Sequence, residues 1–280
     1  MIHDLMLPIT GTTGDDNAVT AAISLAANYG AHVSVVQSVI LPLPIPGPWG
    51  ITPDLMLSEM YAELRAEATK QEVSLRNRLD KESISWEVRV DETKFVEPPS
   101  AMALQARYAD LSVMTAPARG ADDAARVRTF FSALLFESGR PVLVIPPHHA
   151  AELPLRHVVV AWKPCREAAR ALHDALPLLS EATSVDVVIV DPVVGDKDHG
   201  EDPGVDIARH LARHGLTVNV VNRPRNDQTV ATALLRHAAE SGAQLLVAGG
   251  YGHSRLREWA LGGTTRELLQ AIHLPILFSH

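Results

Sequence analysis

The sequence lacks the features that mark several large classes of protein. Its 280 residues include one cysteine, Cys165, which excludes an internal disulfide and a cysteine-based zinc site. No uninterrupted apolar run approaches the ~20 residues of a membrane-spanning helix. The formal net charge is −8, which argues against a general affinity for nucleic acid or for anionic membranes. The start, MIHDLMLPIT, lacks the basic and long apolar regions of a signal peptide, so we expect a cytoplasmic protein.

Signature motifs of catalysis are also missing. The sequence holds no Walker A lysine motif, no G-x-S-x-G elbow and no H-E-x-x-H pair. His210 and His214 have the spacing of two metal ligands on a helix, but the sequence places no third ligand beside them. Cys165 falls near the start of an expected helix, where a thiolate is favoured, although a plain substitution explains it more simply. We expect no catalytic residue and no metal site.

What the sequence does contain is an internal repeat. ADLSVMTAPARG (109–120) resembles AQLLVAGGYGHS (243–254), and SALLFESGRPVLVIP (132–146) resembles RELLQAIHLPILFSH (266–280), both at an offset of 134 residues. The first strands align at an offset of 153 residues, so the first copy holds about 19 additional residues in its middle. We predict two domains, 1–148 and 155–280, joined by a linker at 146–154.

Each copy alternates short apolar, β-branched runs with helical patterns. In the second copy the expected strands are RHVVVAW, VDVVIV, LTVNVV, QLLVAG and PILFS, with helices between them. This order predicts two tandem α/β domains with parallel, doubly wound (Rossmann-like) five-stranded sheets. Ligands of such sheets bind beyond the carboxyl ends of the strands.

The additional residues of the first copy form a proline-rich stretch and a long helix. Thr52-Pro53 predicts the helix start, with proline at its first position. The favoured interpretation is a helix packed on the sheet; the alternative is that the proline-rich loop is a lid or an association surface. The apolar stripe of the helix consists of Leu57, Tyr61, Leu64, Ala68, Leu75 and Leu79.

Two pairs of glycines bracket a charged segment near the end of the sequence. Gly249 and Gly250 end an expected strand, where glycine lets a ligand approach the backbone. Thr264 and Glu267 form a capping box that predicts a helix start at about Thr264. The free N–H groups of that first turn would bind an anion such as phosphate. The alternative is that these glycines only shape a tight loop.

Gly249, Gly252 and Gly262, spaced three and ten residues apart, resemble the nucleotide-binding signature of the universal stress protein family. The resemblance implies a tandem two-domain member in which one chain forms an internal pseudo-dimer through its last strands, 142–145 and 276–278. It also implies binding of ATP or a related adenine nucleotide, with Mg²⁺, and a possible homodimer of the whole chain. The residues that it assigns to the nucleotide are Ala161, Lys163, Ile189, Gly249, Gly252, His253, Gly262, Gly263, Thr264 and Thr265.

The sequence departs from that family pattern at two positions. Gly263 stands where Ser or Thr usually follows the third glycine, and Lys163 stands where ATP-binding members carry Asp. In the first copy Thr115, Ala118 and Arg128 replace the signature glycines, so we expect that domain not to bind nucleotide. The leading hypothesis is a stress-response protein whose second domain binds or senses an adenine nucleotide. The alternatives are a stress protein that acts through protein contacts and a weak ATP hydrolase.

Overall fold

A computed structural model describes residues 1–43, 46–47, 50–51, 54–117, 123–147, 153–193, 195, 202–250 and 263–280. The first half contains β1 (Asp4–Ile9), α1 (Asp15–Tyr29), β2 (His32–Ile40), β3 (Pro46–Gly47), β4 (Gly50–Ile51), α2 (Asp54–Leu79), β5 (Ser85–Thr93), α3 (Pro98–Ala106), β6 (Leu111–Thr115), α4 (Ala124–Glu137) and β7 (Val142–Ile145). The second half contains β8 (His157–Ala161), α5 (Arg166–Leu179), β9 (Ser184–Val190), α6 (Val205–Arg213), β10 (Val218–Arg223), α7 (Val230–Ser241), β11 (Leu245–Gly249), α8 (Gly263–Ala271) and β12 (Ile276–Ser279).

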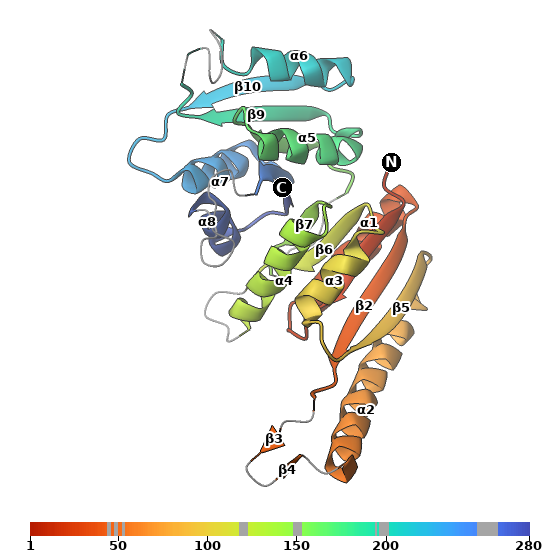
Figure 1. Cartoon of the computed structure of the whole chain (residues 1–280). Coiled ribbons are helices and arrows are strands. Elements are labelled where there is room, and N and C mark those ends of the chain that lie inside the picture. The colour runs from red at the N-terminus through yellow and green to blue at the C-terminus, as the bar shows by residue number, and fades with distance from the viewer. Residues whose placement is uncertain are drawn as a thin grey trace.

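Ten of these strands form one continuous sheet in the order β10-β9-β8-β11-β12-β7-β6-β1-β2-β5 (Figure 1). Within each half neighbouring strands run parallel, and their order is that of a doubly wound sheet. The halves meet where β12 pairs antiparallel with β7, with Ile276 opposite Val144 and Phe278 opposite Val142. The predicted α/β fold and the internal pseudo-dimer through the last strands are therefore confirmed.

The helices cover the two faces of this sheet as two sets. One apolar cluster joins α1, the end of α2, α5 and α6 to the sheet, and the other joins α3, α4, α7 and α8 to the opposite face. Each cluster runs through both halves, because the antiparallel β7–β12 pair continues the sheet without a break. At that junction the rings of Phe131 on α4 and Phe278 on β12 pack edge to face, with centroids 5.3 Å apart.

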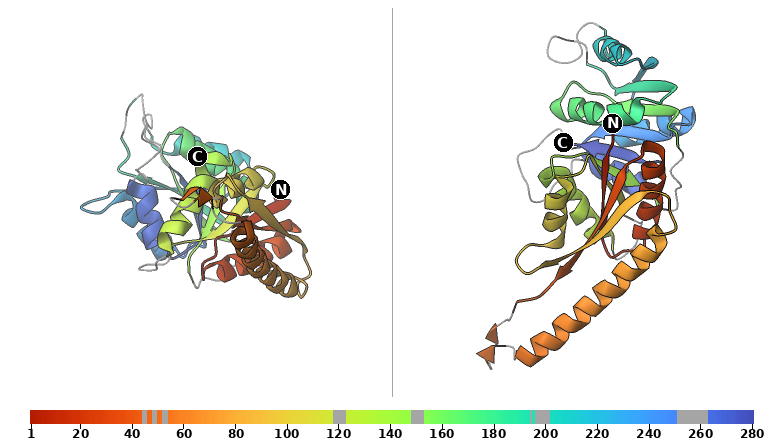
Figure 2. Two further views of the ribbon diagram at one scale, coloured as in Figure 1. Left: turned by 60° about the horizontal axis from the view of Figure 1, so that its bottom comes forward. Right: turned by 90° about the vertical axis from the view of Figure 1, so that its right-hand side faces the viewer.

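The additional residues of the first half form the β3–β4 hairpin and the 26-residue helix α2. Figure 2 shows α2 running outward from the edge of the sheet toward this hairpin. Ala68 packs with Val39 and Leu41, and Leu79 is fully buried, whereas Leu64 is 36% exposed. The predicted packing of α2 on the sheet is thus confirmed for only part of the stripe; Thr52-Pro53 lies outside the described residues. Among the helices described, none has the length and apolarity that crossing a membrane requires.

Candidate functional site at the carboxyl edge of the second half

The topological switch point of the second half lies between β8 and β11. These strands are neighbours, with Val160 beside Val247, and the helices that follow them cover opposite faces of the sheet. Helix α5 follows β8 on one face, and α8 follows β11 on the other. Ligands of doubly wound sheets bind at this position, because the loops diverge there. The predicted nucleotide residues that the structure describes come from these two strand ends, from α8 and from β9.

Gly249, the last residue of β11, lies against the first turn of α5. A Cβ atom added to Gly249 would stand 2.6 Å from the Glu167 carbonyl carbon and 2.7 Å from the Ala168 nitrogen. Both are backbone atoms, so no side-chain rotation could relieve the contact. The packing of α5 on β11 therefore requires glycine here even when no ligand is bound.

In the first half the equivalent contact between a strand end and a helix start is also made by a glycine, but this glycine belongs to the helix start and not to the strand. Thr115 of β6 occupies the position of Gly249, and Gly14 before α1 occupies the position of Glu167. A Cβ atom on Gly14 would lie 2.6 Å from Thr115 Oγ1. Each half thus has one glycine where the strand end meets the helix start. The change from Gly249 to Thr115 is explained by Gly14 and is by itself no sign of a lost ligand site.

Gly250, directly after β11, is hydrogen-bonded to the last residues of its own half and packs against the first half. Its N–H donates to the Ser279 carbonyl at 2.8 Å, and its carbonyl accepts from His280 Nδ1 at 2.9 Å. A Cβ atom on Gly250 would stand 2.7 Å from Leu135 Cδ2 on α4. The first half therefore forms one wall beside the switch point of the second.

Lys163 follows β8 and is exposed, while Ala161 at the strand end is half-buried. The backbone turns sharply here, because the Cys165 N–H donates to the Lys163 carbonyl at 2.7 Å. Among the described residues no carboxylate pairs with the Lys163 ammonium group. A positive charge at the switch point suits an anionic ligand better than the Asp of the family pattern does.

Helix α8 begins at Gly263, one residue before the predicted start. Gly263 and Thr264 are exposed and Thr265 is buried, so Thr264 lies within the first turn rather than ahead of it. The N–H groups of a first helical turn have no partner within the helix and favour an anion. Gly252, His253 and Gly262 lie outside the described residues.

Ile189 does not present a surface to a ligand in this structure. The residue lies near the end of β9 and is 1% exposed. Gly204, at the start of α6, covers it, since a Cβ atom on that glycine would stand 2.8 Å from Ile189 Cδ1. The resemblance assigned Ile189 to the nucleotide site, whereas the structure places it in the apolar cluster under α6.

Cys165 lies immediately before the first residue of α5 and is half-buried. Burial raises the pKa of its thiol, and the neighbouring Glu167 carboxylate raises it further. The raised pKa argues against the thiolate that a helix start can favour, because desolvation and a buried carboxylate outweigh the favourable backbone N–H groups, and it agrees with the simpler interpretation of a plain substitution.

The loop between β1 and α1, which corresponds to this site in the first half, holds its own carboxylate. Asp15 accepts hydrogen bonds from the Gly11 N–H at 2.8 Å, the Thr12 N–H at 3.3 Å and the Thr10 hydroxyl at 2.6 Å. Burial raises the pKa of Asp15 although these donors oppose the shift. The donors of the loop are thus already engaged with an internal acceptor.

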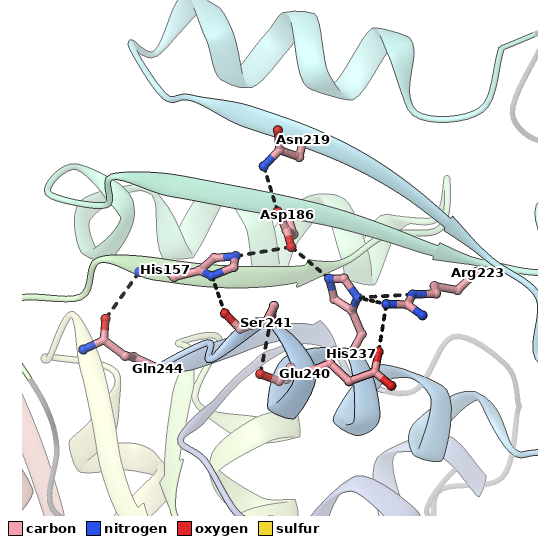
Figure 3. A network of polar contacts seen from close by, with 9 residues as sticks. His157, Asp186, Asn219, Arg223, His237, Glu240, Ser241 and Gln244 are labelled. Atoms are coloured by element: carbon pink, nitrogen blue, oxygen red, sulfur yellow. Dashed lines mark hydrogen bonds and ion pairs between the residues drawn. The ribbon is translucent and has the colours of Figure 1, made fainter.

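A second polar cluster, which no sequence motif indicates, lies under α7 (Figure 3). The Asp186 carboxylate accepts from Asn219 Nδ2 at 3.1 Å and from His237 Nε2 at 2.9 Å, and His157 Nε2 lies 3.2 Å from it. Burial alone would raise the pKa of Asp186. The hydrogen bonds from Asn219 and His237, together with His157, outweigh it and lower that pKa.

The hydrogen bond to the second ring nitrogen of His237 fixes the tautomer of the ring. His237 Nδ1 accepts from the Arg223 guanidinium at 2.9 Å, so the ring proton lies on Nε2 and points to Asp186. Arg223 also pairs with Glu240 at 2.9 Å. The cluster joins β8, β9, β10 and α7, and its centre is buried, because His237 and Asp186 are both under 10% exposed.

Metal ligands do not gather elsewhere in the described residues. No group of three His, Cys, Asp or Glu side chains lies close enough there to hold an ion. The His210 and His214 rings on α6 pack edge to face, with centroids 4.9 Å apart.

The architecture defines a tandem α/β protein with an internal pseudo-two-fold, and comparison with known proteins agrees. No protein-family model matches the sequence, and no curated protein matches it. A universal stress protein structure from Archaeoglobus fulgidus DSM 4304 shares the fold with a TM-score of 0.73 at 17% identity, covering 99% of this chain and 95% of that one. The protein therefore has the fold of that universal stress protein over almost its whole length.

Two other solved structures share the fold less closely. A functionally unknown protein from Pseudomonas aeruginosa PAO1 has a TM-score of 0.55 at 13% identity and covers 99% of this chain and 92% of that one. The cytoplasmic domain of a prokaryotic cation chloride cotransporter has a TM-score of 0.50 at 10% identity and covers 99% of this chain and 95% of that one. One architecture thus occurs in proteins of different kinds, and function has to be argued from the site.

Proposed function

We propose that the protein is a stress-response protein of the universal stress protein family whose second half binds ATP or a related adenine nucleotide as a binding or sensing module. The observation that carries the proposal is the start of α8 at Gly263, with Gly263 and Thr264 exposed, at the carboxyl edge of the sheet beside β8 and β11. Phosphate would lie on the N–H groups of Gly263, Thr264 and Thr265. Mg²⁺ would accompany the nucleotide.

Lys163 adds the charge that this assignment needs. Its exposed ammonium group follows β8 at the same edge of the sheet and has no partner among the residues described. A lysine acts on phosphate as a point charge, whereas an Asp at that position would favour a ribose hydroxyl. We therefore expect phosphate contacts to dominate affinity and recognition of the ribose to be weaker than in members that carry the Asp.

In this proposal the first half binds no nucleotide and serves as the partner domain of the second half. Asp15 already accepts from the Gly11 and Thr12 N–H groups, so an incoming phosphate would meet a half-buried carboxylate. The expected stoichiometry is one nucleotide per chain. No catalytic base is assigned, so any hydrolysis is expected to be slow.

The proposal is tested by nucleotide release and titration. Purified protein is denatured and its supernatant analysed by liquid chromatography, and nucleotide-free protein is titrated with ATP by calorimetry. Co-purified adenine nucleotide or micromolar binding at one site per chain supports the proposal. No release and no heat at high micromolar ATP would reject it and favour the alternative, a stress protein that acts only through protein contacts.

Two variants, each with a matched control, test where the phosphate of the nucleotide binds. Thr264→Glu puts a carboxylate in the first turn of α8, where it favours the helix but repels phosphate. We expect at least a tenfold loss of ATP affinity with no loss of fold. Ala125→Glu, in the first turn of α4, makes the same charge change in the half without nucleotide and should leave affinity unchanged. Lys163→Ala should weaken binding severalfold, with the exposed Lys81→Ala as its matched control.

A further inference from the structure

The junction between the halves contains two crevices that the internal repeat relates to each other. The first is lined by Leu25, Gln244, Leu245 and Pro275. Leu153 of the linker and Leu155 directly after it also line the crevice, and the remaining cavity measures about 20 Å³. This crevice is apolar apart from Gln244, and the linker fills most of it.

The second crevice is built from the corresponding residues of the other half. Leu178, Asp110, Leu111 and Pro141 occupy the positions of the four residues above, and this cavity measures about 190 Å³. The two crevices differ in the charge of their rims. The second crevice has four ionisable rim residues, Arg140, Arg170, His173 and Asp174. The repeat places four uncharged residues at the equivalent positions of the first crevice, Leu274, Asn17, Thr20 and Ala21. The repeat alone therefore accounts for the shape of the crevice but not for its charges.

In each of the two aspartates that line this cavity, only one of the two carboxylate oxygens has a hydrogen-bond partner among the described residues. Asp110 Oδ2 accepts from the His3 N–H at 2.8 Å and the Asp4 N–H at 3.2 Å. Asp174 Oδ2 pairs with Arg170 Nε at 2.8 Å. Within the described ranges neither Oδ1 atom has a hydrogen-bond partner. Each aspartate thus retains one acceptor for a cationic group.

The hydrogen-bond donors of the cavity, Arg140 and His173, also have nitrogen atoms without a partner among the described residues. Arg140 Nε donates to the Arg107 carbonyl at 3.3 Å, while its two terminal nitrogens have no partner in the part of the chain that the structure describes. His173 is exposed and likewise makes no polar contact with the described residues. Ile2, Leu111, Pro177 and Leu178 supply an apolar part of the lining of the same cavity.

We propose that this cavity binds a small zwitterionic amino acid, with its carboxylate on Arg140 and its ammonium group on Asp110 and Asp174. Unused donors and acceptors around an apolar lining match a ligand that carries both charges on a short apolar skeleton. A cavity volume of about 190 Å³ has room for a ligand the size of a small amino acid. The ligand would bridge both halves, because Arg140 and Asp110 belong to the first and Asp174 to the second.

The test is a calorimetric titration of the full chain with L-alanine and β-alanine, with acetate and methylammonium as singly charged controls. We expect millimolar or tighter binding of at least one amino acid and much weaker binding of both controls. Absence of heat with both amino acids would overturn the proposal, as would acetate binding as tightly as alanine. These results do not depend on ATP binding, so this proposal and the proposed function can fail separately.

Two charge-removing variants locate the ligand. Arg140→Gln and Asp110→Asn should each lower affinity at least tenfold, and Arg213→Gln on exposed α6 is the control that should not change it. Asp110→Asn should fold, because Gln244 already uses an amide oxygen at the equivalent position to accept the Arg156 N–H at 2.6 Å and the His157 N–H at 3.3 Å. Unchanged affinity in folded Arg140→Gln and Asp110→Asn variants would show that the ligand binds elsewhere.

Discussion

Gly249→Ala tests whether packing alone requires glycine at the end of β11. The added methyl group would lie 2.6 to 2.9 Å from three backbone atoms of Glu167 and Ala168, against 3.4–4 Å for an ordinary contact. Neither Gly249 nor Gly14 has a positive φ, so alanine is not strained at either position and the cost is steric. Overpacking typically costs about 1–3 kcal/mol, and we expect the upper part of that range because α5 itself must move.

The first half supplies the complementary experiment. Gly14→Ala should also destabilise, by roughly 1–2 kcal/mol, but its obstacle is the side chain of Thr115. Thr115→Gly should remove that obstacle, so the double variant should be more stable than the sum of the single effects predicts. Coupling of about 1 kcal/mol or more is expected for such a contact. No single side-chain change should rescue Gly249→Ala in the same way.

The assay is urea unfolding followed by far-ultraviolet circular dichroism, with midpoints compared at constant slope. Gly263→Ala is the matched control, because a methyl group there would meet nothing within 4 Å. It should be neutral or stabilising, since alanine favours a helix by up to about 1 kcal/mol. Wild-type stability of Gly249→Ala, or additive effects of Gly14→Ala and Thr115→Gly, would refute the reasoning.

Three further predictions concern the interior. His237→Ala leaves Asp186 without its closest partner and should cost about 1.5–3 kcal/mol in urea unfolding at neutral pH, the range for a hydrogen bond to a charged group; a loss under about 0.5 kcal/mol would contradict the role of the cluster. The folded pKa of Asp186 is lowered, so its stabilising contribution is complete above the unfolded value of about 3.9 and is lost as pH falls through the folded value. Asp186→Asn should therefore flatten the acid limb of the stability profile, and an unchanged limb would count against this. Leu79→Ala should cost about 2–5 kcal/mol because Leu79 is fully buried, whereas Val73→Ala on exposed α2 should stay within about 0.5 kcal/mol; equal costs would mean that α2 packs along its whole length.

Much of the architecture could be predicted because its signals are local. Alternating apolar runs and helical patterns predict the strands and helices of each half, since buried parallel strands need β-branched residues on both faces. The repeat with its constant offset then predicts two similar sheets. The resemblance implies pairing of the last strands, for which the apolar segments at 142–145 and 276–278 are suited, and the structure pairs them.

The candidate site could be predicted only in outline. The position of the helix start at Gly263 follows from Thr264 and Glu267 to within one residue, because capping chemistry is local. The burial of Ile189 under Gly204 could not be predicted, since these residues belong to different elements. The raised pKa of the Cys165 thiol depends on burial, which a helix-start pattern does not report.

By itself, the sequence determined the fold class and the repeat, because both follow from patterns along the chain, whereas the pairing of the last strands was implied by the family resemblance. Tertiary structure alone decided why Gly249 and Gly14 are glycines, since each faces an element far away in sequence. It also brought His157, Asp186 and His237 together from three elements, and it left charges around one of two equivalent crevices. These features depend on distances between side chains and backbone across the fold, and a linear pattern of residues does not encode such distances.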